Sequence, residues 1–221
     1  MKKFILVLAV FVIVAAGAFA QFNFAFGGGA LADMSYGNGE IFSYLGYTIK
    51  ETNDFTSFGG FAFLELTYFQ AEICYQYSML SSSREMTGEQ TVYFDNSRTY
   101  ISFNILFKYP INLGLLTLYP IGGFSRNYLQ SITRGSATIK RDDIRNDQKD
   151  WLDQYSFLAG FGFNYKLQGS LYIKTEALFR AAVPSILYVN DAKDANSILP
   201  GSTKATFGFG PMVKLGIGYS F

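Results

Sequence analysis

The chain offers few residues for acid–base or metal chemistry. Its 221 residues include no histidine and one cysteine, Cys74. Histidine is the usual general base near neutral pH and a common metal ligand, so a histidine-dependent nucleophile and an imidazole metal site are excluded. We interpret Cys74 as a small buried side chain rather than a redox or ligating thiol. We therefore expect no enzyme activity, no catalytic or metal-binding residue and no cofactor.

The charged residues are more informative, because many of them fall on one side of segments in which two kinds of residue alternate. These residues are Glu65, Glu72, Lys108, Lys166, Lys174, Glu176, Arg180 and Lys214. Bulky apolar residues occupy the positions between them, and alternation places the two sets on opposite faces of a strand. The clearest segment is Phe207–Phe221, where Leu215 and Ile217 alternate with Lys214, Gly216 and Gly218.

The alternating segments predict the strands. Besides Phe207–Phe221 they are Gln21–Leu31, Phe58–Tyr68, Gln70–Met79, Tyr100–Tyr109, Gln154–Leu167 and Leu171–Val183. Another segment, Leu115–Tyr128, is weaker because its register is ambiguous and Pro120 interrupts it. We include it, since a closed single-chain barrel favours an even number of strands. An alternative with ten strands would add a hairpin at Ile41–Ile49.

In these segments the bulky apolar face is continuous and the opposite face is small or polar. This arrangement suits a barrel with lipid outside and a narrow polar lumen inside. We expect an all-β fold, an eight-stranded antiparallel up-and-down transmembrane β-barrel with short periplasmic turns and long extracellular loops. The short turns are predicted around Phe69, at Pro110–Gly114 and at Leu167–Ser170. The long loops are predicted at Ala32–Ser57, Leu80–Ser97, Leu129–Asp153 and Pro184–Ala205. Tyrosines at the strand ends are expected to lie at the membrane interface.

The charges on the small face then point into the lumen. Charged groups in a narrow interior must be paired or hydrated. They could form an ion-paired plug or line a path for small solutes, and we favour the plug because eight strands leave room for little more than side chains. Phe61, Phe63, Leu64 and Leu158 could line an apolar pocket or simply pack together.

The N-terminus predicts export. Lys2 and Lys3 precede an apolar run at Phe4–Ala16 and an Ala-x-Ala site that ends at Ala20, the pattern of a secretory signal peptide. The run is shorter than the roughly 20 residues of a transmembrane helix. We expect a signal peptide at residues 1–20 and a single barrel domain at residues 21–221.

The net charge of +1 gives no electrostatic footprint for nucleic acid. The predicted loop Leu129–Asp153 carries nearly balanced charges, which is typical of solvated surface. Function on a rigid scaffold nevertheless tends to sit on loops, so this loop is also a candidate for binding a partner.

The last eight residues resemble the C-terminal signal of outer-membrane β-barrels that the barrel-assembly machinery recognises. The matching positions are Lys214, Gly216, Tyr219 and Phe221. Together with the eight-strand layout, they make the mature chain similar to the small outer-membrane barrels, the outer membrane protein X, W and A transmembrane-domain class. The resemblance implies a monomer in the cell outer membrane that contacts outer-membrane lipid, and the assembly machinery during biogenesis.

Two functions are then expected. The first is a non-enzymatic barrel with a structural role, or with a surface role in which the loops contact an extracellular ligand or host surface. The second is a small porin-like channel for hydrophobic or small solutes, as resemblance to the W type would imply.

Overall fold

The computed structural model describes residues 24–44, 47–86, 91–134, 137–143, 153–183 and 207–221. The predicted signal peptide and nearly all of the predicted loop Pro184–Ala205 lie outside these residues.

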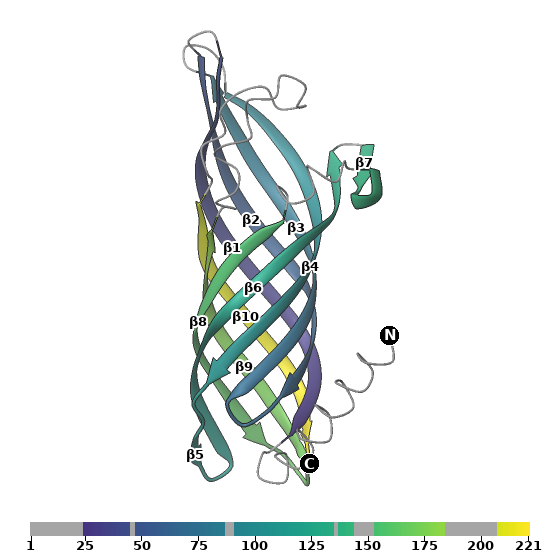
Figure 1. Ribbon diagram of the computed structural model, residues 1–221, viewed down its shortest axis with the longest axis vertical. Coiled ribbons are helices and arrows are strands. Elements are labelled where there is room, and N and C mark those ends of the chain that lie inside the picture. Colours follow the sequence, from purple (N-terminus) through teal and green to yellow (C-terminus); the bar gives the residue numbers. More distant parts are fainter. Residues whose placement is uncertain (1–23, 45–46, 87–90, 135–136, 144–152, 184–206) are drawn as a thin grey trace, which may run out of the picture.

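Eight long strands form one closed antiparallel barrel (Figure 1). They are β1 (Ala25–Tyr44), β2 (Tyr47–Glu65), β3 (Phe69–Met86), β4 (Thr91–Lys108), β6 (Leu116–Arg134), β8 (Gln154–Lys166), β9 (Leu171–Val183) and β10 (Phe207–Ser220). Each strand pairs with its neighbours in chain order, and β1 pairs with β10 to close the circuit. The predicted fold class is confirmed.

Three short elements flank β6. The strand β5 (Ile111–Leu113) pairs with its beginning, and β7 (Ala137–Lys140) pairs with its end. A 3-10 helix, η1 (Arg141–Asp143), follows β7. Within the described ranges, no helix is long and apolar enough to cross a membrane.

The weak strand prediction around Pro120 is correct, because β6 is a full member of the wall. The carbonyl of Pro120 accepts a hydrogen bond from the amide of Tyr109 at 3.2 Å. In a strand the N and O atoms of one residue face the same neighbour, which here is β4. The ladder between β4 and β6 ends one residue away, at Lys108 and Ile121. Pro120 therefore lies where its missing N–H removes no ladder bond.

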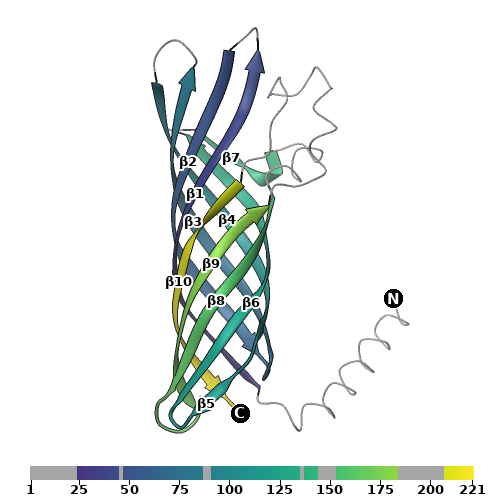
Figure 2. The same ribbon diagram turned by 90° about the vertical axis from the view of Figure 1, so that its left-hand side faces the viewer.

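The predicted turns form one end of the barrel, which we call the turn end; the opposite end is the loop end. Leu66 and Phe69 close the first turn, with an amide-to-carbonyl distance of 2.8 Å. The other two turns contain Gly114 and Gly169, whose φ angles of 75° and 66° favour glycine. Figure 2 shows these turns at the same end as the C-terminus.

Two predicted long loops are strands instead. Ala32–Ser57 belongs to β1 and β2, which pair up to Tyr44 and Tyr47. Leu80–Ser97 belongs to β3 and β4, which pair up to Glu85 and Thr91. The prediction was wrong because it required an apolar face, which a strand needs only where it meets lipid or a core. Ile41–Ile49 is the end of the β1–β2 hairpin, so the ten-stranded alternative is also wrong.

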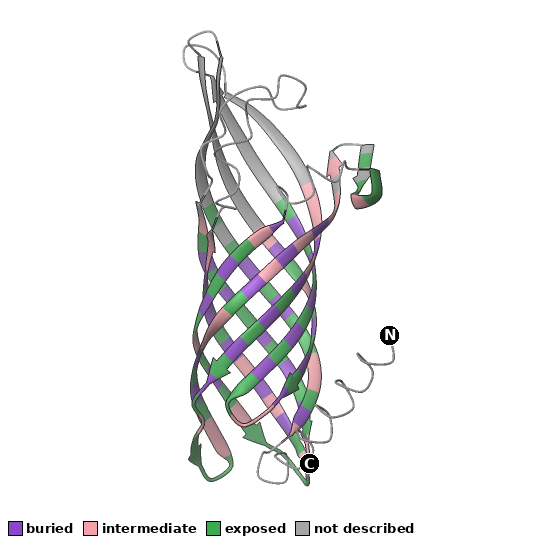
Figure 3. Cartoon of the chain, viewed as in Figure 1, coloured by how far each residue is buried: buried purple, intermediate pink, exposed green. Residues whose placement is uncertain are grey.

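The two faces of the wall are inverted relative to a soluble protein, as predicted. Figure 3 shows buried and exposed residues alternating along each strand. On β10 the side chains of Val213 and Leu215 are 51% and 58% exposed, while Lys214 between them is 1% exposed. The tyrosines expected at the membrane interface all point outward. They are Tyr68, Tyr77, Tyr109, Tyr155, Tyr165 and Tyr219.

Candidate functional site: the ion-paired lumen

Aromatic rings line the lumen near the turn end, and glycines on neighbouring strands make room for them. Tyr119 on β6 lies opposite Gly162 on β8, and a Cβ atom at Gly162 would meet the tyrosine ring. Tyr172 on β9 lies over Gly218 on β10 in the same way. Phe63 on β2 similarly covers a glycine of β1. The glycine-rich inner face of the sequence therefore serves to admit large rings.

The lysines of the lumen lie over these rings. The Nζ atom of Lys174 is 4.9 Å from the ring centroid of Tyr119 and 5.0 Å from that of Phe63. Lys108 lies 5.1 Å from the Tyr119 centroid. Lys214 lies 5.6 Å from the centroid of Phe61. Cation–π attraction of this kind is strongest where water is excluded.

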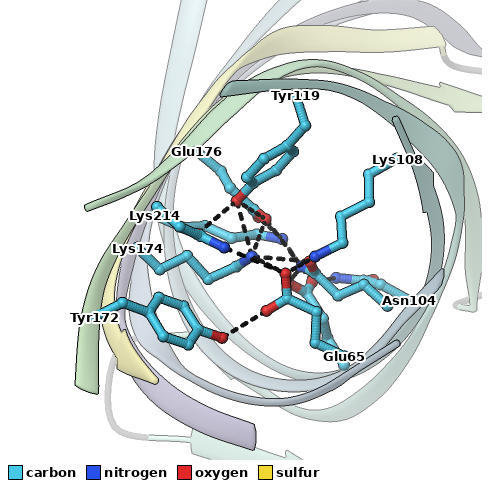
Figure 4. Close-up of polar contacts among 11 residues, drawn as sticks. Glu65, Asn104, Lys108, Tyr119, Tyr172, Lys174, Glu176 and Lys214 are labelled. Atoms are coloured by element: carbon cyan, nitrogen blue, oxygen red, sulfur yellow. Dashed lines mark hydrogen bonds and ion pairs between the residues drawn. The ribbon is translucent and has the colours of Figure 1, made fainter. Parts of the chain in front are cut away.

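Lysines and glutamates then alternate in one continuous chain of ion pairs across the lumen (Figure 4). We call this chain the lumen network; its order is Lys108, Glu65, Lys174, Glu176, Lys214, Glu72. Lys174 Nζ is 2.9 Å from Glu176 and 3.5 Å from Glu65. Lys214 Nζ is 2.5 Å from Glu72 and 3.4 Å from Glu176. Three positive and three negative charges cancel within the network.

Neutral side chains satisfy the carboxylates further. Gln70 donates to Glu72 at 2.6 Å and to Glu176 at 2.9 Å. Asn104 donates to the other oxygen of Glu72 at 2.7 Å. The hydroxyl of Tyr172 donates to Glu65 at 2.7 Å. Glu176 Oε2 makes no hydrogen bond but is paired with Lys214. Buried charges are tolerated when each is paired and most of their oxygens accept hydrogen bonds.

The network ties opposite walls of the barrel together. Lys214 extends from β10 and its partner Glu72 from β3, which are separated by two strands in one direction around the wall. Among the described side chains, every barrel strand except β1 contributes a member or a hydrogen-bonding neighbour. None of the six charged residues is more than 8% exposed. The side chains of the network therefore pack against one another inside the barrel at this level.

Six of the eight predicted lumen charges meet in this network, and two do not. Arg180 lies elsewhere in the lumen, where Nη1 is 2.7 Å from Oδ2 of Asp33. Asp33 was missed because it fell in the predicted loop; extending the alternation past Leu31 would have found it. Lys166 is exposed at the end of β8, next to a turn. Lys166 lies on the inward side of the strand but at the rim of the barrel, where its side chain reaches solvent. Its assignment to the lumen charge network is therefore corrected.

Tyr119 and Gln70 were also missing from the predicted charge cluster. Gln70 has the same alternation as Glu72, so the pattern could have found it. Tyr119 lies in the segment whose register was ambiguous, and no local signal identifies its role.

Of the two alternatives for Phe61, Phe63, Leu64 and Leu158, an apolar pocket or packing, the structure supports packing for three of the four. Leu64 is 54% exposed and points outward. Phe61 and Phe63 pack in one buried cluster with Cys74, while Leu158 packs in another with Leu106, Leu178 and Met212. The four residues therefore do not line one pocket. Cys74 is 1% exposed and packs in this interior.

The C-terminal residues that resemble an assembly signal divide between the two faces. Lys214 and Gly216 point inward, whereas Tyr219 and Phe221 are exposed. The Phe221 ring lies 5.6 Å from that of Phe24, at the seam between the first and last strands. Lys214 thus has a place in the lumen network whether or not the assembly machinery reads it. Recognition by that machinery stays a prediction.

No group of three or more histidine, cysteine, aspartate or glutamate side chains is placed to hold a metal ion within the described part of the chain.

Two solved structures resemble the chain distantly. No family model and no curated protein matches the chain. The crystal structure of the outer membrane protease OmpT from Escherichia coli matches with 10% identity over 90% of this chain and 96% of that chain, with a TM-score of 0.41. The translocator domain of the autotransporter NalP from Neisseria meningitidis matches with 11% identity over 88% of each chain, with a TM-score of 0.26.

Likenesses this distant carry no argument about activity, and the finer resemblance to the X, W and A class stays a prediction. The fold rests on the strand pairing of this chain. The protein is a closed eight-stranded antiparallel β-barrel with an apolar exterior and an ion-paired lumen.

Proposed function

We propose that this protein is a monomeric outer-membrane β-barrel that is closed to solutes and has a structural or surface-interaction role. Its apolar exterior and inverted alternation support the membrane location, because such a wall would be insoluble in water. The turn end is then periplasmic and the loop end extracellular. The role is non-enzymatic, in keeping with the absence of histidine.

The observation that carries the proposal is the lumen network. A diffusion channel needs a hydrated path, and charged residues lining such a path would be partly exposed. Here the Nζ atoms of Lys174 and Lys214 are surrounded by carboxylates and rings, and both side chains are fully buried. Moving a solute past them would require several buried ion pairs to open together, which is costly in a low-dielectric interior.

A channel for small or hydrophobic solutes is the second candidate. It is favoured by the buried apolar residues that share the lumen with the network, among them Leu106, Leu158 and Met212. These side chains could surround a small apolar molecule if the packing opened. They also fill the lumen as they stand, so we place this function second.

Solute flux separates the two candidates. The purified protein is reconstituted into vesicles loaded with small polar or apolar dyes, and release is compared with that from protein-free vesicles. We expect no added release from the wild type. Release from a Lys174→Ala/Tyr119→Ala variant is the matched positive control, because that change removes side chains from the middle of the lumen. Release from the wild type equal to that of the variant would favour the channel.

A surface role is tested by removing loop residues without damaging the wall. Leu129 and Asp153 are both buried, and the Leu129 amide donates to Asp153 at 3.3 Å. A deletion should therefore be confined to residues 144–152. Loss of binding to cells or extracellular matrix, with unchanged folding, would support a role for this loop. Unchanged binding would leave the structural role.

A further inference from the structure

The hairpin formed by β5 and the beginning of β6 carries exposed apolar side chains at the turn end. Figures 1 and 2 show β5 at the far turn end of the barrel. Ile111, Leu113 and Leu115 are 47%, 57% and 59% exposed, close to the 58% of the outward-facing wall residue Leu215. A turn that lies in water is normally built from polar residues, so this composition indicates a different surrounding.

The hairpin presents few polar groups on its outer side. β5 pairs with the first residues of β6. On the other face, the Thr117 hydroxyl donates to the side-chain oxygen of Asn112 at 2.8 Å. The Tyr109 amide donates to β6, so the neighbouring Pro110 faces the open edge, and its missing N–H leaves no donor at that position. The outer side of the hairpin is therefore mainly hydrocarbon.

The same stretch of chain carries no charge. No charged residue occurs between Lys108 and Arg126, and Lys108 belongs to the lumen network. Arg126 is thus the first charge along β6; its guanidinium carbon lies 4.7 Å from the ring centroid of Tyr128 and 5.2 Å from that of Tyr155. A partner that binds through opposite charges would find none on the hairpin, whereas an apolar surrounding suits it.

The hairpin also supplies height that the wall lacks on this side. An outer-membrane barrel carries an apolar band ~25 Å tall. The apolar outer face of β4 from Ile101 to Tyr109 covers about 20 Å, at ~3.3 Å per residue and a tilt of ~40°. Continuing through β5 to Leu113 adds about 10 Å. On β6, the distance from Arg126 down to Leu116 is about 25 Å, which places the edge of the band at the hairpin.

We propose that the apolar tip of the β5–β6 hairpin penetrates the phospholipid layer at the turn end, where Leu113 and Leu115 contact lipid at the boundary between headgroups and acyl chains. The hairpin continues the apolar outer wall without a polar break, so the same lipid that covers the wall covers the tip. The proposal rests on the membrane location proposed above. It moves one predicted turn, Pro110–Gly114, from water into the lipid layer.

Depth-dependent quenching of a tryptophan reporter tests the contact. The chain contains one tryptophan, Trp151, so the reporter is Leu113→Trp in a Trp151→Phe background. The protein is folded into vesicles of phosphatidylcholine that carries bromine, a contact quencher, either near the headgroup or near the chain ends. We expect a strong loss of emission with bromine near the headgroup and a smaller loss with bromine near the chain ends. Emission should also lie at a shorter wavelength than that of tryptophan in water.

Asn112→Trp in the same background is the matched control, because it lies in the same hairpin on the opposite face and should lose less emission. Quenching of Leu113→Trp that is absent, or equal to that of Asn112→Trp, would overturn the contact. Short-wavelength emission without quenching would overturn it too, because protein, such as a second copy, would then cover the tip. Leu215→Trp reports the wall itself. If it is quenched and Leu113→Trp is not, this inference alone fails; if neither is quenched, the proposed membrane location fails.

Discussion

The lumen holds two sets of buried ion pairs, and they are built differently. In the lumen network each carboxylate has several donors; Glu72, for example, accepts from Lys214, Gln70 and Asn104. The pair between Asp33 and Arg180 stands apart from it. Neither Asp33 oxygen makes a hydrogen bond of good geometry, although Oδ2 is 2.7 Å from Arg180.

The two sets differ in which strands their ion pairs connect. Asp33 and Arg180 reach each other across the intervening strand β10, with Gly210 opposite Arg180. They link nearby parts of the wall. The lumen network links distant strands, such as β3 and β10. A cross-lumen network resists opening because no member can leave without stranding another charge, whereas a single pair can be lost locally. Removing a member of either set measures this contrast.

The largest effect is expected from Lys214→Met. The substitution removes the cation shared by Glu72 and Glu176. Glu176 keeps its ion pair with Lys174, whereas Glu72 keeps only the neutral donors Gln70 and Asn104. Breaking a buried pair in this way should lower the free energy of unfolding by about 3–5 kcal/mol. Urea unfolding of the barrel in lipid vesicles measures the loss.

Lys214→Met/Glu72→Gln is the matched control. It removes one carboxylate together with the cation, so it should be more stable than the single variant. If the double variant is as unstable as the sum of two independent changes, the residues do not act as one network.

The second largest effect is expected where an inward glycine makes room for an aromatic ring. In Gly162→Ala the added Cβ would meet the Tyr119 ring, which in turn lies against Lys108 and Lys174. Overpacking of this kind should cost about 1–3 kcal/mol, measured by the same unfolding titration. Gly208→Ala is the control, because the nearest atom to its Cβ would be 3.6 Å away. Its cost should stay within about 0.5 kcal/mol. Equal costs would mean that the ring position is not fixed by glycine.

The smallest effect is expected from Asp33→Asn. The amide keeps the volume of Asp33, and Arg180 keeps other interactions. We expect a loss of about 1 kcal/mol, the low end of the cost of leaving a buried polar group, here the Arg180 guanidinium, short of one partner. Unfolding titrations of this variant beside Lys214→Met give the comparison directly. A loss as large as that of Lys214→Met would show that the pair and the network are equivalent.

The sequence predicts the network better than it predicts the loops, for a physical reason. Alternation with a period of two is strictly local, so it placed Lys174, Glu176 and Lys214 on the inward face without any knowledge of their partners. Alternation alone does not tell where a strand or the barrel wall ends. Lys166 has the inward alternation, but the wall ends beside it. Asp33 lies inward in a strand whose alternation continues past Leu31, with Met34 and Tyr36 exposed on the opposite face, but the predicted strand ended at Leu31.

Other features depend on the path of the chain in space. Which lysine pairs with which glutamate depends on how the strands are offset from one another around the closed wall. The shared Tyr128 ring of Arg126 and Arg141 depends on the fold-back of β7 and η1 onto β6. The predicted loop Leu129–Asp153 was interpreted as solvated surface, yet Asp153 is buried against Arg141. Such contacts leave no periodic trace in the sequence.

Single-channel recording in planar bilayers tests the central claim most directly, because it reports whether ions pass the lumen network in the intact protein. For the wild type we expect insertion without steady conductance at neutral pH and moderate voltage. Steady openings of defined size from the purified wild-type protein would contradict the closed lumen.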